Sequence, residues 1–134
     1  MPEPFKILLI EDDPDDIDFL REAFKDNAID VNLDILMRGD LITNWLNSDS
    51  PSPHLIVMDL NLPKLHGREV LCMIKAKKKY AKVPIVVLTT SSLEEDKDFC
   101  LKKGADTFIS KPSSPEGFDE LVKSLVKTVK NKAV

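Results

Sequence analysis

The sequence has few of the residues that build zinc sites, disulfide frameworks and membrane segments. It holds two cysteines and two histidines in 134 residues. Cys72 and Cys100 have no short spacing to each other or to His54 and His66, which argues against a zinc motif or a disulfide scaffold and favours reduced packing thiols. The N-terminal apolar run 7–10 is too short for a secretory signal or a membrane helix. We therefore expect a cytoplasmic protein.

An excess of one charge sign is also missing. The 19 Lys and Arg against 23 Asp and Glu leave a net charge of −4, which argues against a large surface for nucleic-acid phosphates. Lysines do cluster in 75–82 and 123–132, and we interpret both clusters as solvated faces. A hydrophobic content of 43% with 31% charged residues is typical of a globular protein. The length predicts one domain over residues 1–134.

Five short apolar segments alternate with five longer segments at helical spacing. Segments 7–10, 55–58 and 83–88 are continuously apolar, which is typical of strands covered on both faces. Segment 31–35 alternates apolar and polar residues and 107–109 is short, so both are expected at sheet edges. Helices of roughly ten to fifteen residues are expected to begin near 14, 40, 66, 93 and 115. Their signals include an Asp13 cap and capping boxes at 92–95 and 113–116, and Gly104 fits the end of the fourth.

This alternation predicts an α/β fold with a flavodoxin-like, doubly wound, five-stranded parallel sheet of strand order 2-1-3-4-5 and five helices. In such a sheet, ligands bind beyond the C-terminal strand ends, between the first and third strands. Glu11 and Asp12 directly follow the first strand, and Asp59 follows the third. Clustered carboxylates repel unless a cation or a proton intervenes. Because the ligands are oxygens only, we expect Mg²⁺ rather than zinc.

Two further strand ends bring other polar groups to the same edge of the sheet. Thr89 begins a Thr-Thr-Ser run whose hydroxyls can donate to an anionic oxygen or cap the next helix. Lys111 follows the last strand. It is either an ordinary surface charge or a fixed cation that neutralises a phosphoryl group bound beside the acids.

Four segments together resemble the response-regulator receiver domain of two-component signalling: ILLIEDD, LIVMDLNLPKLHG, PIVVLTTSS and GADTFISKP. Asp59 and Thr89 are 30 residues apart, and Thr89 and Lys111 are 22 apart, which is similar to the receiver spacing of phosphoacceptor, hydroxyl and lysine. The runs DLNLP…HG and TTSS look closest to the small stand-alone receivers associated with phytochromes.

The resemblance implies that Asp59 is the phosphoacceptor. It implies that Asp12, Asp59 and the backbone carbonyl of Asn61 are Mg²⁺ ligands, with Glu11 acting through metal-bound water. Thr89 and Lys111 would bind the phosphoryl oxygens. The aspartyl phosphate would then be hydrolysed in the same site. The protein is thus expected to be a signalling phosphoacceptor, not an enzyme, that catalyses its own phosphorylation and dephosphorylation.

The resemblance also implies a switch and an output. Phe108 stands where the family often has tyrosine, and is either a switch residue together with Thr89 or a plain core aromatic. The implied partners are a sensor histidine kinase or phosphotransfer protein, an unknown downstream protein and a possible second copy in a homodimer. They would be contacted through the fourth helix, fifth strand and fifth helix, with no nucleic acid or membrane involved. A cis Lys111–Pro112 peptide is also implied.

Two other functions compete with this interpretation. Asp13-Pro14-Asp15 formally reads D-x-D, the motif of Mg²⁺-dependent phosphatases with an aspartyl nucleophile, although Ile17 replaces the threonine expected after it. We interpret Asp13 as a cap, and the remaining acids of 15–18 as a solvated helix start that suits the helix dipole: Asp15, Asp16 and Asp18. A flavodoxin-like FMN binder would need a glycine- or hydroxyl-rich phosphate loop after the first strand, where this chain has acids.

Overall fold

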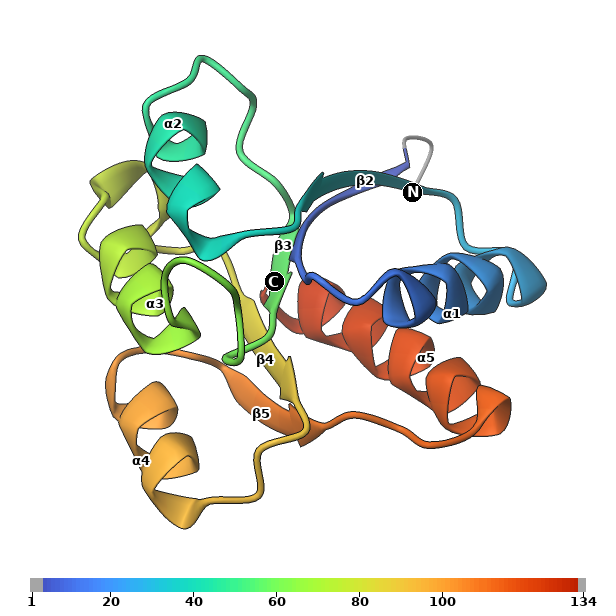
Figure 1. Ribbon diagram of the computed structural model, residues 1–134. Coiled ribbons are helices and arrows are strands. Elements are labelled where there is room, and N and C mark those ends of the chain that lie inside the picture. Colours follow the sequence, from blue (N-terminus) through green and yellow to red (C-terminus); the bar gives the residue numbers. More distant parts are fainter. Residues whose placement is uncertain (1–3, 133–134) are drawn as a thin grey trace.

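A parallel sheet forms the frame of the molecule. In the computed structural model, which describes residues 4–132, five strands pair in the order β2-β1-β3-β4-β5 (Figure 1). Their bounds are β1 Phe5–Ile10, β2 Val31–Leu36, β3 Leu55–Met58, β4 Ile85–Thr89 and β5 Thr107–Ser110. All four pairings are parallel, so the C-terminal strand ends meet at one edge. The predicted fold class and strand order are confirmed.

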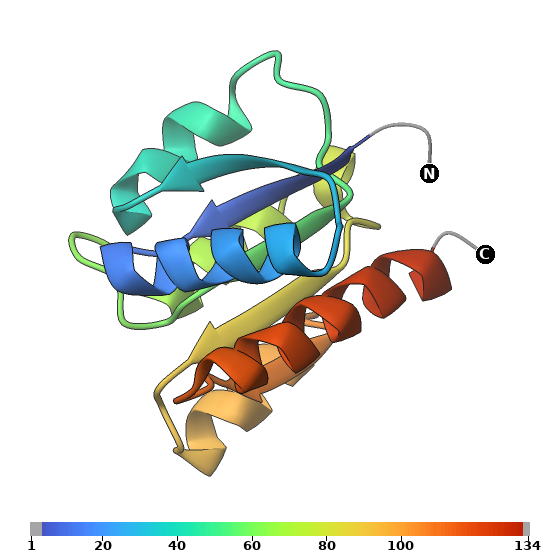
Figure 2. The ribbon, with the colours of Figure 1, turned by 90° about the vertical axis from the view of Figure 1, so that its right-hand side faces the viewer.

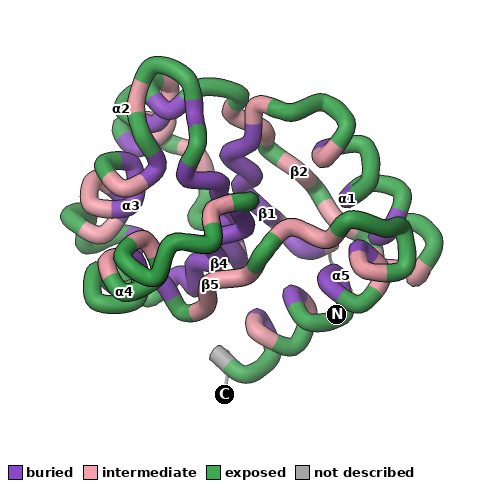
Figure 3. Tube along the Cα trace, turned by 60° about the horizontal axis from the view of Figure 1, so that its bottom comes forward, coloured by how far each residue is buried: buried purple, intermediate pink, exposed green. Residues whose placement is uncertain are grey.

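Helices cover both faces of the sheet. The helices α1 (Pro14–Asp26) and α5 (Pro115–Lys132) lie side by side on one face, in front in Figure 2. The other face carries α2 (Ile42–Leu46), α3 (Gly67–Lys75) and α4 (Glu94–Lys102), with 3₁₀ turns η1 (Gly39–Leu41) and η2 (Lys78–Tyr80). Each face buries its own apolar cluster, because alternate β1 residues point to opposite sides. The central strands are therefore buried at every residue except Lys6 of β1 (Figure 3).

The edge position of β2 follows from its sequence. Its alternating residues Asn32 and Asp34 are exposed, whereas the apolar residues between them are half-buried against the α1 and α5 side. The β4 strand begins at Ile85, two residues later than predicted from the apolar run. Pro84 lacks an N–H for the ladder, but its carbonyl still accepts from the Ile56 N–H at 3.0 Å.

Side-chain caps begin the two helices of the α1–α5 face. The Asp13 carboxylate accepts from the Asp15 N–H at 2.9 Å, as predicted. At α5 the Ser114 hydroxyl accepts from the Gly117 N–H at 3.2 Å, so the cap lies one residue after the predicted Ser113. Both caps satisfy N–H groups that have no partner inside the helix.

The other face departs further from the sequence prediction. The capping box at 92–95 is wrong: α4 begins after Leu93, which makes no side-chain cap bond. The helix α2 spans only five residues, shorter than expected, and buries only Ile42 and Leu46, so packing supports little more than one turn. Gly104 ends the α4 region with φ of +107°, a conformation that glycine adopts without a Cβ clash.

The cysteines behave as packing residues. Both thiols are free; Cys100 is fully buried in α4 and Cys72 is half-buried on α3. Burial raises the pKa of the Cys100 thiol to about 11, so the group stays protonated at neutral pH. Within residues 4–132, no helix is long and apolar enough to cross a membrane.

Candidate functional site

Three carboxylates meet at the C-terminal ends of β1 and β3. Ile10 pairs with Met58, so the residues that follow, Glu11 and Asp59, leave the sheet at the same level. The Asp59 N–H donates to the Ile10 carbonyl at 3.0 Å. One carboxylate oxygen from each of Glu11, Asp12 and Asp59 lies within 4.8 Å of the other two. The sheet thus brings together the acids that the sequence predicted to share a site.

Backbone N–H groups orient the two buried acids. Glu11 and Asp59 are 1% and 4% exposed, and Asp12 is more open to solvent. The Glu11 Oε2 atom accepts from the N–H groups of Asp12 and Asp13 at 3.0 and 3.2 Å. The Asp59 Oδ1 atom accepts from Leu60 N at 2.7 Å and Asn61 N at 3.3 Å. Each carboxylate therefore keeps its other oxygen for a different partner.

That partner is Lys111. Its Nζ lies 2.8 Å from Glu11 Oε1, 2.8 Å from Asp16 Oδ2 and 2.9 Å from Asp59 Oδ2. Only 8% of the lysine side chain is exposed. An ammonium group has three N–H donors, so all three are directed to acids. Of the two interpretations left open by the sequence, a surface charge and a cation beside the acids, the structure supports the second.

The predicted cis Lys111–Pro112 peptide is wrong, because no peptide bond in the described part of the chain is cis. The Lys111 N–H donates to the Thr89 carbonyl at 3.0 Å, which extends the β4–β5 pairing by one step. From there the four-carbon side chain reaches the carboxylates across a trans bond. No sharp turn after the lysine is needed to aim it.

Burial and charge perturb the ionisation of this cluster. The pKa of Glu11 is raised to about 7, chiefly because burial penalises its charged form and also because Asp59 is near, while Lys111 opposes the rise. Burial acts to lower the pKa of Lys111, but hydrogen bonds to Asp16, Glu11 and Asp59 outweigh it and the pKa is raised. The lysine therefore stays charged at neutral pH, whereas Glu11 titrates close to neutral pH.

Asp16 is the residue of this cluster that the sequence interpretation missed. It was assigned to a solvated helix start, yet its Oδ2 bonds Lys111 across 95 residues of chain. A signal for it was present: Asp16 precedes the buried Leu20 and Ala23 by four and seven residues, which is the spacing of one helix face. Asp16 therefore begins the inward face of α1 at the end that points to the site.

Thr89, Phe108 and Asn61 are the remaining residues that the sequence assigned to the site. Thr89 is fully buried at the end of β4, and its Oγ1 accepts from the Ser91 N–H at 3.3 Å. Phe108 pairs with Val87 in the sheet and is half-buried against the α3–α4 side. Asn61 is exposed after β3 and donates its N–H to Asp59. The role of its carbonyl as a metal ligand stays a prediction.

The donor set fits a hard, hydrated cation. The clustered groups are carboxylate oxygens without histidine or cysteine, which suits Mg²⁺ or Mn²⁺ better than zinc. By contrast, the D-x-D acids Asp13 and Asp15 are exposed, and Asp13 is occupied as a helix cap. The geometry supplies no second acidic site there for an aspartyl phosphatase.

Comparisons with known proteins agree with this geometry. A sequence profile described as "Response regulator receiver domain" matches residues 7–123. The chain is 44% identical over 98 residues to "Response regulator Rcp1" of Synechocystis sp. (strain ATCC 27184 / PCC 6803 / Kazusa), covering 69% of this chain and 67% of that protein. Its fold is similar to the phosphorylated cyanobacterial phytochrome response regulator RcpA (TM-score 0.85, 30% identity, 93% of both chains). It is also similar to the Mn²⁺-bound form of Rcp1 (TM-score 0.82, 35% identity, 91% of both chains).

Proposed function

We propose that Asp59 accepts a phosphoryl group from the histidine of a sensor kinase or phosphotransfer protein. The basis is that this chain belongs to the response regulator receiver domain family. One observation carries the proposal. Asp59 is a buried carboxylate with one oxygen held by backbone N–H groups and the other 2.9 Å from the Lys111 ammonium. This is an oriented nucleophile with a fixed cation beside it.

The chemistry follows from that orientation. A bond forms between Asp59 Oδ2 and phosphorus while the bond from phosphorus to the donor's histidine nitrogen breaks, and the electron pair stays on that nitrogen. Lys111 exchanges Asp59 Oδ2 for a phosphoryl oxygen and keeps its charge beside the group. The Thr89 hydroxyl binds a second phosphoryl oxygen. Positioning and charge neutralisation are what phosphoryl transfer chiefly requires. Later attack by water on phosphorus returns the Asp59 carboxylate and inorganic phosphate, so the signal limits itself.

Mg²⁺ is the proposed cofactor. The carboxylates of Glu11, Asp12 and Asp59 would hold it, with the Asn61 carbonyl as a further ligand, and the ion would supply positive charge opposite the phosphoryl oxygens. A charge count supports this. Lys111 alone faces three acids, including Asp16, and Asp12 adds a fourth, so the site favours one more cation. The related Rcp1 has been solved in a Mn²⁺-bound form.

Output is proposed to occur by protein contact on the α4–β5–α5 face, either with a downstream protein or with a second copy. Leu93 and Leu101, at the start and near the end of α4, are 63% and 41% exposed, which supplies apolar contact area. Phe108 on β5 is half-buried between this face and the core. The one-domain organisation over residues 1–134 and the cytoplasmic location stay predictions.

The test is phosphorylation by acetyl phosphate with Mg²⁺, followed by intact mass and peptide mapping. We expect one phosphoryl group on Asp59. The Asp59→Asn variant should take none, and Asp18→Asn, which changes an exposed carboxylate of α1, should behave as wild type. Labelling of Asp59→Asn at the wild-type level would refute the assignment. Steady turnover of p-nitrophenyl phosphate that persists in Asp59→Asn would instead support the phosphatase alternative.

A further inference from the structure

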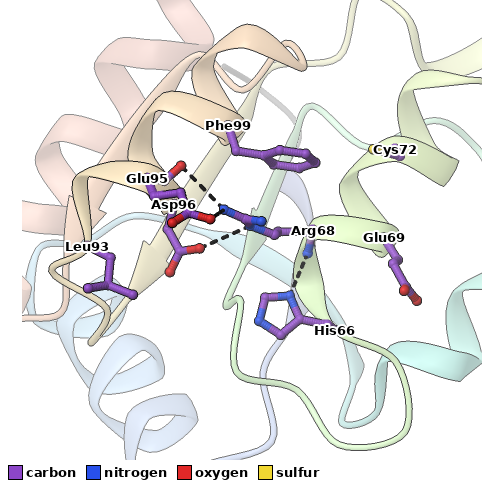
Figure 4. Close-up of a pocket in the computed structure, with 8 residues that line it drawn as sticks. All are labelled: His66, Arg68, Glu69, Cys72, Leu93, Glu95, Asp96 and Phe99. Atoms are coloured by element: carbon purple, nitrogen blue, oxygen red, sulfur yellow. Dashed lines mark hydrogen bonds and ion pairs between the residues drawn. The ribbon is translucent and has the colours of Figure 1, made fainter.

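Arg68 connects α3 to α4 through a partly buried ion pair. Its Nε lies 3.0 Å from Asp96 Oδ1, and the two side chains are 28% and 16% exposed. Its guanidinium carbon stands 4.4 Å from the centre of the Phe99 ring. Figure 4 shows this arrangement at a groove of about 630 Å³ between the two helices. A stacked guanidinium with a shielded carboxylate is more strongly fixed than an exposed pair.

Two hydrogen bonds through Ser91 connect Asp96 to the Thr89 hydroxyl. Asp96 uses its second oxygen, Oδ2, to accept from the Ser91 hydroxyl at 2.6 Å. The Ser91 N–H in turn donates to Thr89 Oγ1 at 3.3 Å. Because Thr89 Oγ1 is an acceptor in that bond, its own proton is left for another acceptor. The Ser91 contact thus holds the hydroxyl oxygen in place and leaves it able to donate.

On the α3 side, Arg68 lies next to a residue that contacts the backbone of Asp59. Arg68 follows Gly67, whose N–H donates to the Leu60 carbonyl at 2.8 Å. A Cβ on Gly67 would stand 2.5 Å from both the Asp59 carbonyl oxygen and Leu60 Cα, so α3 begins in direct contact with the backbone of Asp59 and Leu60. Arg68 therefore stands between the segment that carries Asp59 and the segment that carries Thr89.

We propose that Arg68 and Asp96 are positioning residues that set the placement of the Thr89 hydroxyl relative to Asp59. This proposal rests on the proposed function of Asp59. The Arg68–Asp96 pair matters because α4 has no side-chain cap and buries only Cys100. Little else therefore fixes the segment between Thr89 and α4. Arg68 also contacts the backbone carbonyl and the carboxylate of Glu95, but both distances are 3.4 Å, at the limit of hydrogen-bond length, and the Glu95 side chain is 83% exposed.

The prediction is kinetic. Without the Arg68–Asp96 pair, the Thr89 hydroxyl samples positions away from the arriving phosphoryl group. Misplacement of a catalytic group lowers the rate of phosphoryl transfer steeply. We expect Arg68→Gln to slow phosphoryl uptake from acetyl phosphate at saturating Mg²⁺ on the order of tenfold. Mg²⁺ binding should be unchanged, because none of the acids Glu11, Asp12 and Asp59 contacts the pair.

If the Arg68–Asp96 pair serves only stability, its loss should lower the unfolding midpoint and leave the uptake rate of the folded protein unchanged. The distinguishing measurement is a double-mutant cycle with Ser91→Ala, which breaks the same chain of bonds at another point. If both residues act through one chain, Arg68→Gln combined with Ser91→Ala should be no slower than the slower single variant. Arg68→Lys, which retains a cation for Asp96, should recover part of the rate.

The matched control is Arg38→Gln. Arg38 also pairs with a carboxylate at 3.0 Å, but with Asp40 at the surface, where both side chains are nearly half exposed. Its uptake rate should equal that of wild type. If wild type and this control take up no phosphate, the proposed function itself fails. If they are phosphorylated and Arg68→Gln and Asp96→Asn are phosphorylated equally fast, the positioning role is refuted while the function stands. Asp96→Asn supplies the result if Arg68→Gln does not fold.

Discussion

Replacement of Glu11 by glutamine should stabilise the metal-free protein, although it removes a partner of Lys111. Glu11 is 1% exposed, and its pKa is raised from 4.5 to about 7 in the folded protein, chiefly by burial. In the unfolded chain it ionises near its ordinary pKa. Between the two values the folded state holds one more proton than the unfolded state, so the unfolding free energy falls as pH rises through this window.

The size of the effect follows from the pKa difference. At 1.36 kcal/mol per pH unit, the raised pKa of Glu11 corresponds to a loss of about 3 kcal/mol of stability between about pH 4.5 and pH 7.5. Glutamine resembles the neutral acid and has no such dependence. Glu11→Gln should therefore raise the unfolding free energy by about 3 kcal/mol at about pH 8 and change it little at about pH 4.5.

Urea unfolding in the presence of a chelator measures this difference, with fluorescence of the single tryptophan, Trp45, as the signal. Trp45 is half-buried against Tyr80, with ring centroids 5.1 Å apart, so unfolding should change its emission. Glu22→Gln changes an exposed glutamate of α1 and serves as the control, because other titrating groups cancel in the comparison. A difference between wild type and Glu11→Gln that does not grow with pH would refute the reasoning.

Three further predictions concern the other groups of the site. Mg²⁺ should stabilise wild type by roughly 2.7 kcal/mol when its free concentration is about 100 times its Kd, and Asp12→Ala should largely abolish this shift of the thermal midpoint; an unchanged midpoint in wild type would contradict the metal site. Lys111→Met leaves buried Glu11 and Asp59 without their cation, so the metal-free unfolding free energy at about pH 8 should fall by about 3–5 kcal/mol, with a smaller loss in acid, where Glu11 is protonated. Thr89→Ala should take up phosphate at least in part, yet show no phosphorylation-dependent change in self-association or in amide exchange across residues 89–130; a wild-type response in this variant would place the switch elsewhere.

The elements that the sequence predicted correctly are those in which local pattern and burial coincide. The strands β1, β3 and β4 are apolar apart from Lys6 and Thr89, because both of their faces are covered. Parallel pairing then brings Glu11 and Asp59 together without further information. The missed features depend on contacts distant in sequence. The Asp16–Lys111 pair spans 95 residues. The helix dipole explains an acid at the start of α1, but the neighbouring sequence gives no sign of the distant lysine.

The start of α4 is the other place where local signals failed, and the failure has a physical meaning. The predicted Ser92 box is absent because the nearby polar groups serve a different network: the Ser91 hydroxyl donates to Asp96, and Asp96 pairs with Arg68 on α3. A helix end held by tertiary contacts instead of its own cap is stable only while those contacts last.

This arrangement suits a helix that must respond to the site. The helix α4 buries a single residue, Cys100, whereas α1 buries four and begins with its own cap. Local opening requires the least free energy where few apolar groups are buried and the end is uncapped. In the proposed function, a phosphoryl group that binds the Thr89 hydroxyl pulls on Ser91 through the Ser91 N–H contact, and so acts directly on the contacts that hold this helix start. The displacement is therefore expected to go into α4 and the adjoining face of β5, and α1, although Asp16 contacts Lys111, should keep its position.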